Sequence, residues 1–228
     1  EEENGTVSYI SLEYAKHGDL FGIISKSGYM SEPLARTLFA QLVEGVSYIH
    51  SRKVAHLDLK IANLLIDEEF KLKITDFDLA HAFSEDSTPS ISSRGSCGYR
   101  APEIKDGSCR NPIAADIYSL GVILFIMLSG NPPYAEVNKD GEYQFDHFYK
   151  LMRRNNEKFW EVHSKHKPVK NFFNEEAIDL INWMLCEDAE SRPTIQDIKG
   201  HPWFQKEILS KEKYQEAMRN YMNKSKRS

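Results

Sequence analysis

The sequence has little cysteine and no excess of positive charge. Only three of its 228 residues are cysteines, Cys97, Cys109 and Cys186, and they lie far apart without a CxxC pair. This pattern argues against a disulfide framework or a zinc site and favours a reducing compartment, so we expect a cytoplasmic protein. The net charge of -5 gives no indication of a nucleic-acid partner.

The sequence also lacks a hydrophobic run long enough to cross a membrane. Its longest strongly apolar run, LGVILFIML at residues 120–128, falls short of the roughly 20 residues that a bilayer requires. We therefore expect a buried core helix and no membrane insertion. No signal peptide is visible, and the chain begins with Glu1 rather than Met, so residue 1 need not be the natural start.

The spacing of apolar residues predicts few strands and many helices. Residues 6–15 are rich in β-formers and predict a strand that leads into a linker. Residues 31–52 start with a helix-initiating Ser-Glu-Pro and carry apolar residues at helical spacing. The stretches NLLID and KLKITDF predict two short strands joined by the turn DEEF.

The remaining segments are predicted in less detail. Residues 84–98 are rich in serine and predict a mobile loop, and residues 131–143 predict another loop. Short helices are expected from GDLFGIISKSG and, in amphipathic form, from NEEAIDLINWML. The charged tail, residues 205–228, predicts a solvated helix that frays, or alternatively the start of a regulatory or docking segment.

Three polar residues interrupt the otherwise apolar stretch HLDLKIANLL at residues 56–65. Asp58, Lys60 and Asn63 could simply satisfy backbone groups in a turn. A second stretch, KITDFDLA at residues 73–80, adds Asp76 after a β-rich run. Together the two stretches supply a base, a cation and two oxygen ligands, which is what phosphoryl transfer with Mg²⁺ requires.

These two stretches resemble the catalytic centre of eukaryotic-type protein kinases. The resemblance implies that Asp58 is the catalytic base, that Lys60 steadies the γ-phosphate of ATP, and that Asn63 and Asp76 hold Mg²⁺. It extends over about residues 7–204, with further matches in the family's order: GSCGYRAPEI (95–104), DIYSLGVILF (116–125), SRPT (191–194) and HPWF (201–204).

The resemblance also implies the fold and its division. We expect an α+β, mainly α-helical fold: the C-terminal lobe of a kinase, with short β-hairpins at the active site. Residues 1–15 would be the last strand of the N-terminal lobe and the hinge, residues 16–204 the C-terminal lobe, and residues 205–228 the charged tail. Arg192 is then the expected buried partner of Glu103.

The nucleotide would bind near the start of the chain. By resemblance, Leu12 lies at the gatekeeper position, the Glu13 carbonyl and Ala15 amide pair with the adenine edge, Asp19 reaches the ribose, and Leu65 forms the floor under the adenine. Plain core packing is the alternative for Leu65, and both interpretations can hold together.

Local residues bear on the protein substrate. Lys60, two residues after the base, resembles the Ser/Thr kinases and can act as a point charge on the phosphate. Ser96 falls where the family has a Thr that bonds the catalytic Asp and Lys, a role that its hydroxyl can fill. Ala62 replaces a Glu that binds substrate Arg in many basophilic kinases, which argues against a strong Arg preference there, although Asp19 could still recruit a basic residue.

The sequence departs from the family pattern in three ways. Leu57 replaces an Arg that normally pairs with a phosphorylated loop residue, and Asp78 replaces a Gly at a position with demanding dihedrals. The Gly-rich loop, the strand Lys and its Glu partner are absent from residues 1–228. We therefore expect a fragment that binds ATP feebly, with an apolar docking surface exposed near Leu12, Leu20, Leu65 and Phe77.

Two functions remain open at this point. One is an ATP- and Mg²⁺-dependent Ser/Thr protein kinase acting on protein substrates, and the other is a pseudokinase-like binding module without turnover. The presence of Asp58, Lys60, Asn63 and Asp76 favours the kinase. Residues 136–147 weakly resemble a calcium-binding loop. A bidentate Glu is missing from the last position, so calcium binding is not expected.

Overall fold

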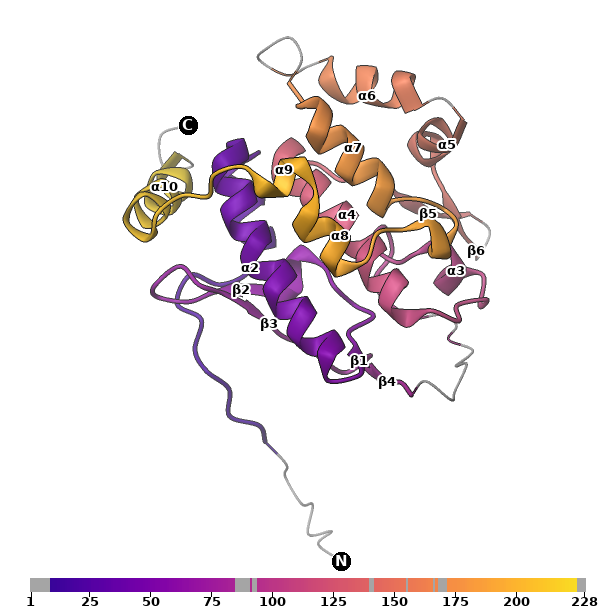
Figure 1. Cartoon of the computed structure of the whole chain (residues 1–228), viewed down its shortest axis with the longest axis horizontal. Helices are drawn as coiled ribbons and strands as arrows, with labels where there is room; N and C mark the ends of the chain where they lie inside the picture. The colour runs from indigo at the N-terminus through magenta and orange to yellow at the C-terminus, as the bar shows by residue number, and fades with distance from the viewer. Residues whose placement is uncertain are drawn as a thin grey trace, which may run out of the picture.

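A computed structural model shows an α+β fold that is mainly α-helical, as the sequence predicts (Figure 1). The structure describes residues 9–84, 91, 94–139, 142–154, 156–165, 167 and 172–224. Its longer helices are α1 (Leu20–Ser27), α2 (Glu32–Ser51), α4 (Pro112–Ser129), α5 (His147–Arg154), α6 (Asn156–Ser164), α7 (Glu175–Met184) and α10 (Lys211–Asn223). Shorter ones are η1 (Ile61–Asn63), α3 (Pro102–Lys105), η2 (Ala189–Ser191), α8 (Ile195–Gly200) and α9 (Pro202–Gln205).

The helix α4 forms the centre of the core. It begins after Asn111, whose side-chain oxygen accepts a 3.1 Å hydrogen bond from Ala114 N, and it ends at Gly130 in the left-handed conformation (φ 76°). At Gly121 an added Cβ would lie 2.9 Å from atoms of Met184 and Leu185, so this glycine allows α7 to cross closely. By length and composition α4 could span a membrane, but 94% of it is buried inside the protein, and it is the expected core helix.

Short antiparallel strand pairs flank the helices. The pair β2 (Leu64–Ile66) and β3 (Leu72–Ile74) is the predicted hairpin, with Leu64 opposite Ile74 and Ile66 opposite Leu72. A second pair joins β1 (Val54–Ala55) to β4 (His81–Ala82). These two pairs enclose the stretch between residues 56 and 63, and they therefore fix both ends of the predicted catalytic loop.

The predicted strand at residues 6–15 is not found in the part of it that the structure describes. Residues 9–15 are irregular, and the side chains of Tyr9, Ile10, Leu12 and Tyr14 are 75–89% exposed. In Figure 1 this segment runs away from the helices toward the N-terminus. No neighbouring strand among the described residues pairs with it, and without a partner the β-formers cannot build a ladder.

The predicted loop at residues 131–143 is also wrong in part. It contains most of the hairpin of β5 (Glu136–Lys139) and β6 (Glu142–Phe145), in which Glu136 lies opposite Phe145. Of the predicted mobile loop at residues 84–98, only Ser84, Ile91 and residues 94–98 lie within the described part, and Ile91 forms an isolated bridge with Cys109. Its mobility stays a prediction.

The tail was predicted to be a solvated helix, and the structure corrects this. Helix α10 packs on the body through one buried stripe, Tyr214, Met218 and Tyr221, each 5% exposed or less. The hydroxyl of Tyr214 donates a 2.7 Å hydrogen bond to Phe70 O, and that of Tyr221 donates to Gly28 O. The burial of three large side chains outweighs the charge of the opposite face, so the helix docks.

Candidate active site

Asp58, Lys60 and Ser96 are brought together as one connected group. The Lys60 ammonium donates to Asp58 Oδ2 at 2.6 Å and to Ser96 Oγ at 2.8 Å. A direct bond between Ser96 and Asp58 is not found among the described residues, so the structure shows only half of the contact that the family pattern implies. Asp58 is 7% exposed, and within the described part its Oδ1 is buried without a hydrogen-bond partner.

The two expected metal ligands lie on adjoining segments. Asn63 ends η1, and its side-chain nitrogen donates to Asp58 O at 3.0 Å and to Asp58 Oδ2 at 3.3 Å, which leaves its side-chain oxygen to act as a ligand. Thr75 N donates to Asn63 O at 3.0 Å and so places Asp76 next to Asn63. Asp76 is exposed, in a left-handed conformation (φ 68°).

These two residues are a sparse set of oxygen ligands. No group of three His, Cys, Asp or Glu side chains that could hold a metal is found in the part of the chain that the structure describes. Mg²⁺ commonly binds through one or two protein oxygens together with phosphate oxygens and water. The pair therefore suits Mg²⁺ carried with a nucleotide better than a resident metal held by protein alone.

Asp116 holds the catalytic loop from behind, a role that the sequence analysis missed. Its fully buried carboxylate accepts 2.8 Å bonds from His56 N and Leu57 N, and a 2.8 Å bond joins it to His50 Nε2. His56 in turn reaches Thr75 O through Nε2 at 3.0 Å, which links the catalytic loop to the segment that carries Asp76. In the sequence, the signal for this role was a carboxylate residue within an otherwise apolar predicted helix.

The two substituted positions behave differently. Leu57 is buried and left-handed (φ 62°), a conformation that is costly for a branched side chain and is held here by the bonds to Asp116. Asp78 is not among the described residues with positive φ, so the strain expected from replacing glycine is absent in this conformation. Gly95 packs closely on the loop, because a Cβ there would lie 2.7 Å from Leu57 O.

The residues expected to bind the nucleotide are only partly gathered. Asp19 and Leu65 face each other in an isolated antiparallel bridge, and Asp19 also caps α1 by accepting a 2.7 Å bond from Gly22 N. The Glu13 carboxylate lies 3.0 Å from Lys73 Nζ on β3. Leu12 is 75% exposed, and Ala15 lies in the irregular segment before α1.

The expected docking surface for a missing lobe is partly wrong. Leu12 and Phe77 are exposed and Leu65 is half-buried, but Leu20 is fully buried. Leu20 is the first residue of α1, and it packs into the main core, so the helix directs it inward rather than toward the nucleotide side.

One expected pair outside the catalytic loop is confirmed. Arg192 donates from Nη1 and Nη2 to the two carboxylate oxygens of Glu103 at 2.6 and 2.8 Å. Its Nη1 also donates to Ala114 O, at the start of α4. This buried fork fixes α3, directly after the segment of Ser96, onto the central helix.

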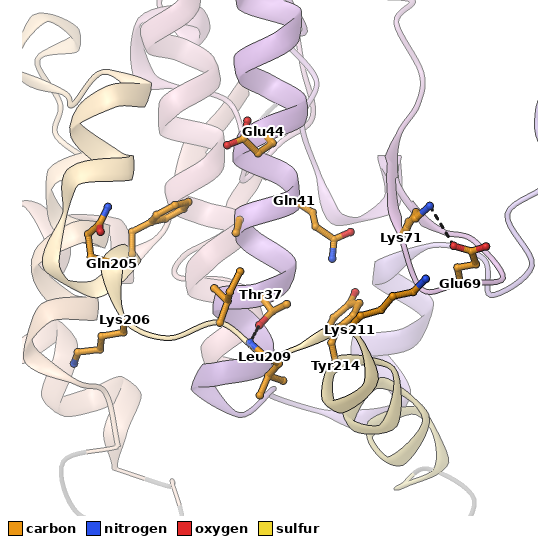
Figure 2. A pocket seen from close by; sticks show the side chains of 13 residues that line it. Thr37, Gln41, Glu44, Glu69, Lys71, Gln205, Lys206, Leu209, Lys211 and Tyr214 are labelled. Atoms are coloured by element: carbon orange, nitrogen blue, oxygen red, sulfur yellow. Dashed lines mark hydrogen bonds and ion pairs between the residues drawn. The ribbon is translucent and has the colours of Figure 1, made fainter.

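The largest of the described cavities lies away from Asp58, Lys60 and Ser96. A groove of about 830 Å³ is bounded by α2, the turn between β2 and β3, and the segment leading into α10 (Figure 2). Figure 2 shows Gln41 and Thr37 on one wall and Leu209, Lys211 and Tyr214 on another. None of the catalytic-loop residues lines it, so size alone does not identify the active site here.

Comparison with known proteins agrees with the geometry. The family model of the protein kinase domain matches residues 2–204, and the chain belongs to this family. The match covers the catalytic loop, the metal-binding triplet Asp76-Phe77-Asp78 and the segment at residues 95–104. The class of protein is therefore a eukaryotic-type protein kinase of the Ser/Thr kind.

Individual relatives are similar along most of this chain. Serine/threonine-protein kinase GIN4 of Saccharomyces cerevisiae is 37% identical over 204 residues, covering 90% of this chain and 17% of the relative. Testis-specific serine/threonine-protein kinase 1 of Homo sapiens is 36% identical over 209 residues, 90% of this chain and 53% of the relative. CBL-interacting protein kinase 11 of Oryza sativa subsp. japonica is 36% identical over 212 residues, covering 92% of this chain and 39% of the relative. The chain thus spans about half or less of these relatives.

Proposed function

We propose that this Ser/Thr protein kinase domain transfers the γ-phosphoryl group of ATP to Ser or Thr hydroxyls of protein substrates. The observation that carries the proposal is the hydrogen bonding of the two carboxylate oxygens of Asp58. Its Oδ2 is held by Lys60, while its buried Oδ1 has no partner among the described residues. An unpaired buried carboxylate oxygen is costly, and a substrate hydroxyl would satisfy it.

The transfer follows from these positions. A substrate hydroxyl donates to Asp58 Oδ1, its oxygen forms a bond to the γ-phosphorus, and the bond from that phosphorus to the bridging oxygen breaks, which releases ADP. The hydroxyl proton passes to Asp58. Lys60 offers its positive charge to the transferring group while keeping Asp58 oriented, and Ser96 holds Lys60 in place.

Asn63 and Asp76 would hold Mg²⁺ beside the phosphates. The ion would neutralise charge on the phosphate oxygens. The chain's own contribution is to orient the ligands, because the amide nitrogen of Asn63 is fixed by Asp58 and the backbone of Thr75 is fixed by Asn63. On the nucleotide side we assign Leu12, Glu13, Ala15, Asp19 and Leu65 to the adenosine, as the resemblance implies.

We further propose that residues 1–228 need additional chain for useful turnover. They contain no Gly-rich loop and no strand Lys for the phosphates. Each lost charge-assisted contact costs roughly 1.5–3 kcal/mol, and about 4 kcal/mol turns micromolar affinity into millimolar. Residues 1–228 alone are therefore expected to bind Mg²⁺-ATP only weakly, and micromolar binding by calorimetry would contradict this.

The alternative function is a pseudokinase-like binding module. Leu57 favours it, because a phosphate on the loop after Asp78 lacks its usual Arg partner near the base. The backbone at Asp78 favours the active enzyme, because Asp78 is not among the described residues with positive φ and so adds no left-handed strain beside Asp76. A cytoplasmic location is proposed on the basis of the three unpaired cysteines.

The decisive experiment measures transfer of labelled γ-phosphate to a panel of Ser- and Thr-containing peptides, using the natural protein with any upstream sequence. Phosphopeptide and ADP should form in equal amounts, and chelation of Mg²⁺ by EDTA should stop both. Peptide binding without any transfer in the presence of Mg²⁺-ATP would establish the binding module instead.

A further inference from the structure

The segment that carries Ser96 is closed into one turn. The amides of Tyr99 and Arg100 both donate to Ser96 O, at 3.1 and 3.2 Å. Gly98 lies inside this turn with a φ of 81°, a conformation that glycine adopts without strain. Because Ser96 Oγ accepts a 2.8 Å bond from Lys60, the position of this turn decides where the Lys60 ammonium lies.

One acid from a different element holds this turn. Glu136 is the first residue of β5, and its side chain has no exposed surface. Its Oε1 accepts from Gly98 N at 3.0 Å, and its two carboxylate oxygens accept from Arg100 Nε and Nη2 at 2.6–3.2 Å. The Arg100 side chain is only 12% exposed, so these bonds are charge-assisted and largely shielded from water. A single carboxylate therefore binds both a backbone amide and a guanidinium of the same turn.

The hairpin that supplies Glu136 is attached at its base. Ala135 N donates to Asp146 Oδ2 at 3.0 Å, and Asp146 N donates to Ala135 O at 3.0 Å. Phe145, which lies opposite Glu136 in the ladder, stacks on Tyr149 of α5 with ring centroids 3.8 Å apart. The carboxylate of Glu136 is therefore carried by an anchored strand rather than by a free loop.

We propose that Glu136 is a positioning residue for phosphoryl transfer and acts through the turn that carries Ser96. Loss of its charge leaves the buried Arg100 without this partner, so the turn shifts and Ser96 holds Lys60 less well. The competing explanation is a salt bridge that only stabilises the hairpin, which predicts a lower free energy of unfolding with normal catalysis. The effect on turnover rests on the proposed phosphotransfer, whereas the holding of the turn can be measured without it.

The kinetic test is a double-mutant cycle in the natural protein with any upstream sequence. Glu136→Gln removes the charge and keeps the shape, and it should lower kcat by about five- to tenfold, no more than Ser96→Ala does. The KM for ATP should stay within about twofold, because only the position of Lys60 changes. In the Ser96→Ala background the same substitution should lower kcat by less than about twofold, because the hydroxyl through which it acts is gone. An unchanged kcat in Glu136→Gln, or an equal loss in both backgrounds, would overturn the proposal.

Variants of the partner residue give a second route to the same answer. Arg100→Lys keeps a cation for Glu136 and should retain at least about a third of kcat, whereas Arg100→Met should lose as much as Glu136→Gln. If Glu136→Gln does not fold, this pair decides the proposal, and equal kcat values for the Lys and Met variants would overturn it.

Phe145→Leu is the control for stability. It loosens the base of the hairpin and leaves the charges of Glu136 and Arg100 in place. It should lower the midpoint of urea unfolding while kcat stays within about twofold. A loss of kcat equal to that of Glu136→Gln would show that the stability of the hairpin, and not the ion pair, is responsible, and would overturn the proposal.

Amide hydrogen exchange in the natural protein tests the turn without catalysis. The amides of Gly98, Tyr99 and Arg100 should exchange about tenfold faster in Glu136→Gln, because one bond is lost directly and the other two depend on the turn. Unchanged exchange overturns the positioning role and leaves the kinase function intact. Faster exchange, in a protein that transfers no phosphate to any peptide with Mg²⁺-ATP even when unaltered, defeats the proposed function and retains Glu136 as the residue that holds the turn.

Discussion

The carboxylate of Asp116, inside the buried helix α4, accepts a 2.8 Å hydrogen bond from the backbone nitrogen of Leu57. The same carboxylate accepts from His56 N and contacts His50. Since Leu57 directly precedes Asp58, this hydrogen bond to α4 fixes the position of the catalytic base Asp58. The strained backbone of the catalytic loop is thus stabilised by a residue far away in the sequence.

Replacement of Asp116 by Asn should therefore harm both stability and turnover. The side-chain amide nitrogen introduced by this substitution would face backbone donors, and bonds to a charged acceptor are worth about 1.5–3 kcal/mol. We expect the free energy of unfolding in urea to fall by about 3 kcal/mol. Asp106→Asn, at a side chain that is 67% exposed, is the control and should change it by less than about 0.5 kcal/mol. Equal midpoints for the two variants would contradict the prediction.

Asp58 and Asp76 should separate catalysis from nucleotide binding. Asp58→Asn in the natural protein keeps the shape but removes the proton acceptor, so turnover should fall by roughly 10²–10⁴-fold with ATP affinity retained. Asp76→Asn should also weaken Mg²⁺-ATP binding, because it removes a charged ligand. Calorimetry and peptide phosphorylation distinguish the two outcomes. Similar turnover in Asp58→Asn and the unaltered protein would be incompatible with its role as base.

Ser96 should depend on its hydroxyl rather than its size. Ser96→Thr keeps the acceptor for Lys60, which lies 2.8 Å from Ser96 Oγ, and should retain most activity. Ser96→Ala removes it and should lower kcat about tenfold, with KM for ATP little changed, because the loss affects the position of Lys60. A Thr variant as inactive as the Ala variant would show that packing, not the hydrogen bond, matters at this position.

Loop phosphorylation should matter little for activity. Leu57 is buried and apolar, so it offers no charge to a phosphate on the loop at residues 84–98. The candidate sites Ser84, Ser87, Thr88, Ser90, Ser92 and Ser93 are in the sequence, although most lie outside the described residues. Phosphatase treatment should leave peptide phosphorylation within a few-fold. A tenfold fall in activity would mean that another cation pairs with the phosphate in place of the Arg that Leu57 replaces. Arg94, within the loop itself, is the candidate.

Tyr214 should make stability fall at alkaline pH. Burial raises the pKa of Tyr214 to about 12 in the folded state, against about 10 when unfolded. Its contribution is complete below pH 10 and is lost as pH rises toward 12, by up to about 2.7 kcal/mol. Tyr214→Phe should cost about 1 kcal/mol at pH 8 through the lost bond to Phe70, but should lose less stability than the unaltered protein between pH 10 and 12.

Urea unfolding at several pH values checks this, and Tyr48→Phe on the exposed face of α2 serves as the control. Parallel stability curves for Tyr214→Phe and the unaltered protein would show that the phenol is not protected in the folded state, and that α10 is less firmly docked than the structure shows.

The sequence predicted the elements whose signals are local. The helix α2 follows from its Ser-Glu-Pro start and helical apolar spacing, and the hairpin of β2 and β3 from two β-rich runs around a polar turn. The pairing of Arg192 with Glu103 followed from the resemblance, since the two residues lie far apart in the chain. The family motifs likewise placed Asp58, Lys60 and Ser96 in one group, which the structure reproduces.

The errors arose where distant contacts decide the outcome. Residues 9–15 have strand composition but no partner strand in the described part of the chain, and Asp116 gains its role only through the fold. Two errors had visible signals. The Asp-Gly pair at residues 140–141 is a typical hairpin signal, and the spacing of Tyr214, Met218 and Tyr221 marks one apolar helix face.

The docking of α10 sets a practical limit for anyone shortening this protein. The family match stops at residue 204, but the aromatic stack of His17 on Phe70, with ring centroids 4.5 Å apart, is covered in part by Arg219, 5.4 Å from the Phe70 ring. A chain cut at residue 204 would lose the cover of Arg219 over Phe70 and the buried side chain of Met218, and would expose the apolar surface on which α10 packs. The smallest unit that keeps its own surface closed therefore ends near Asn223, about one helix beyond the end of the family-model match.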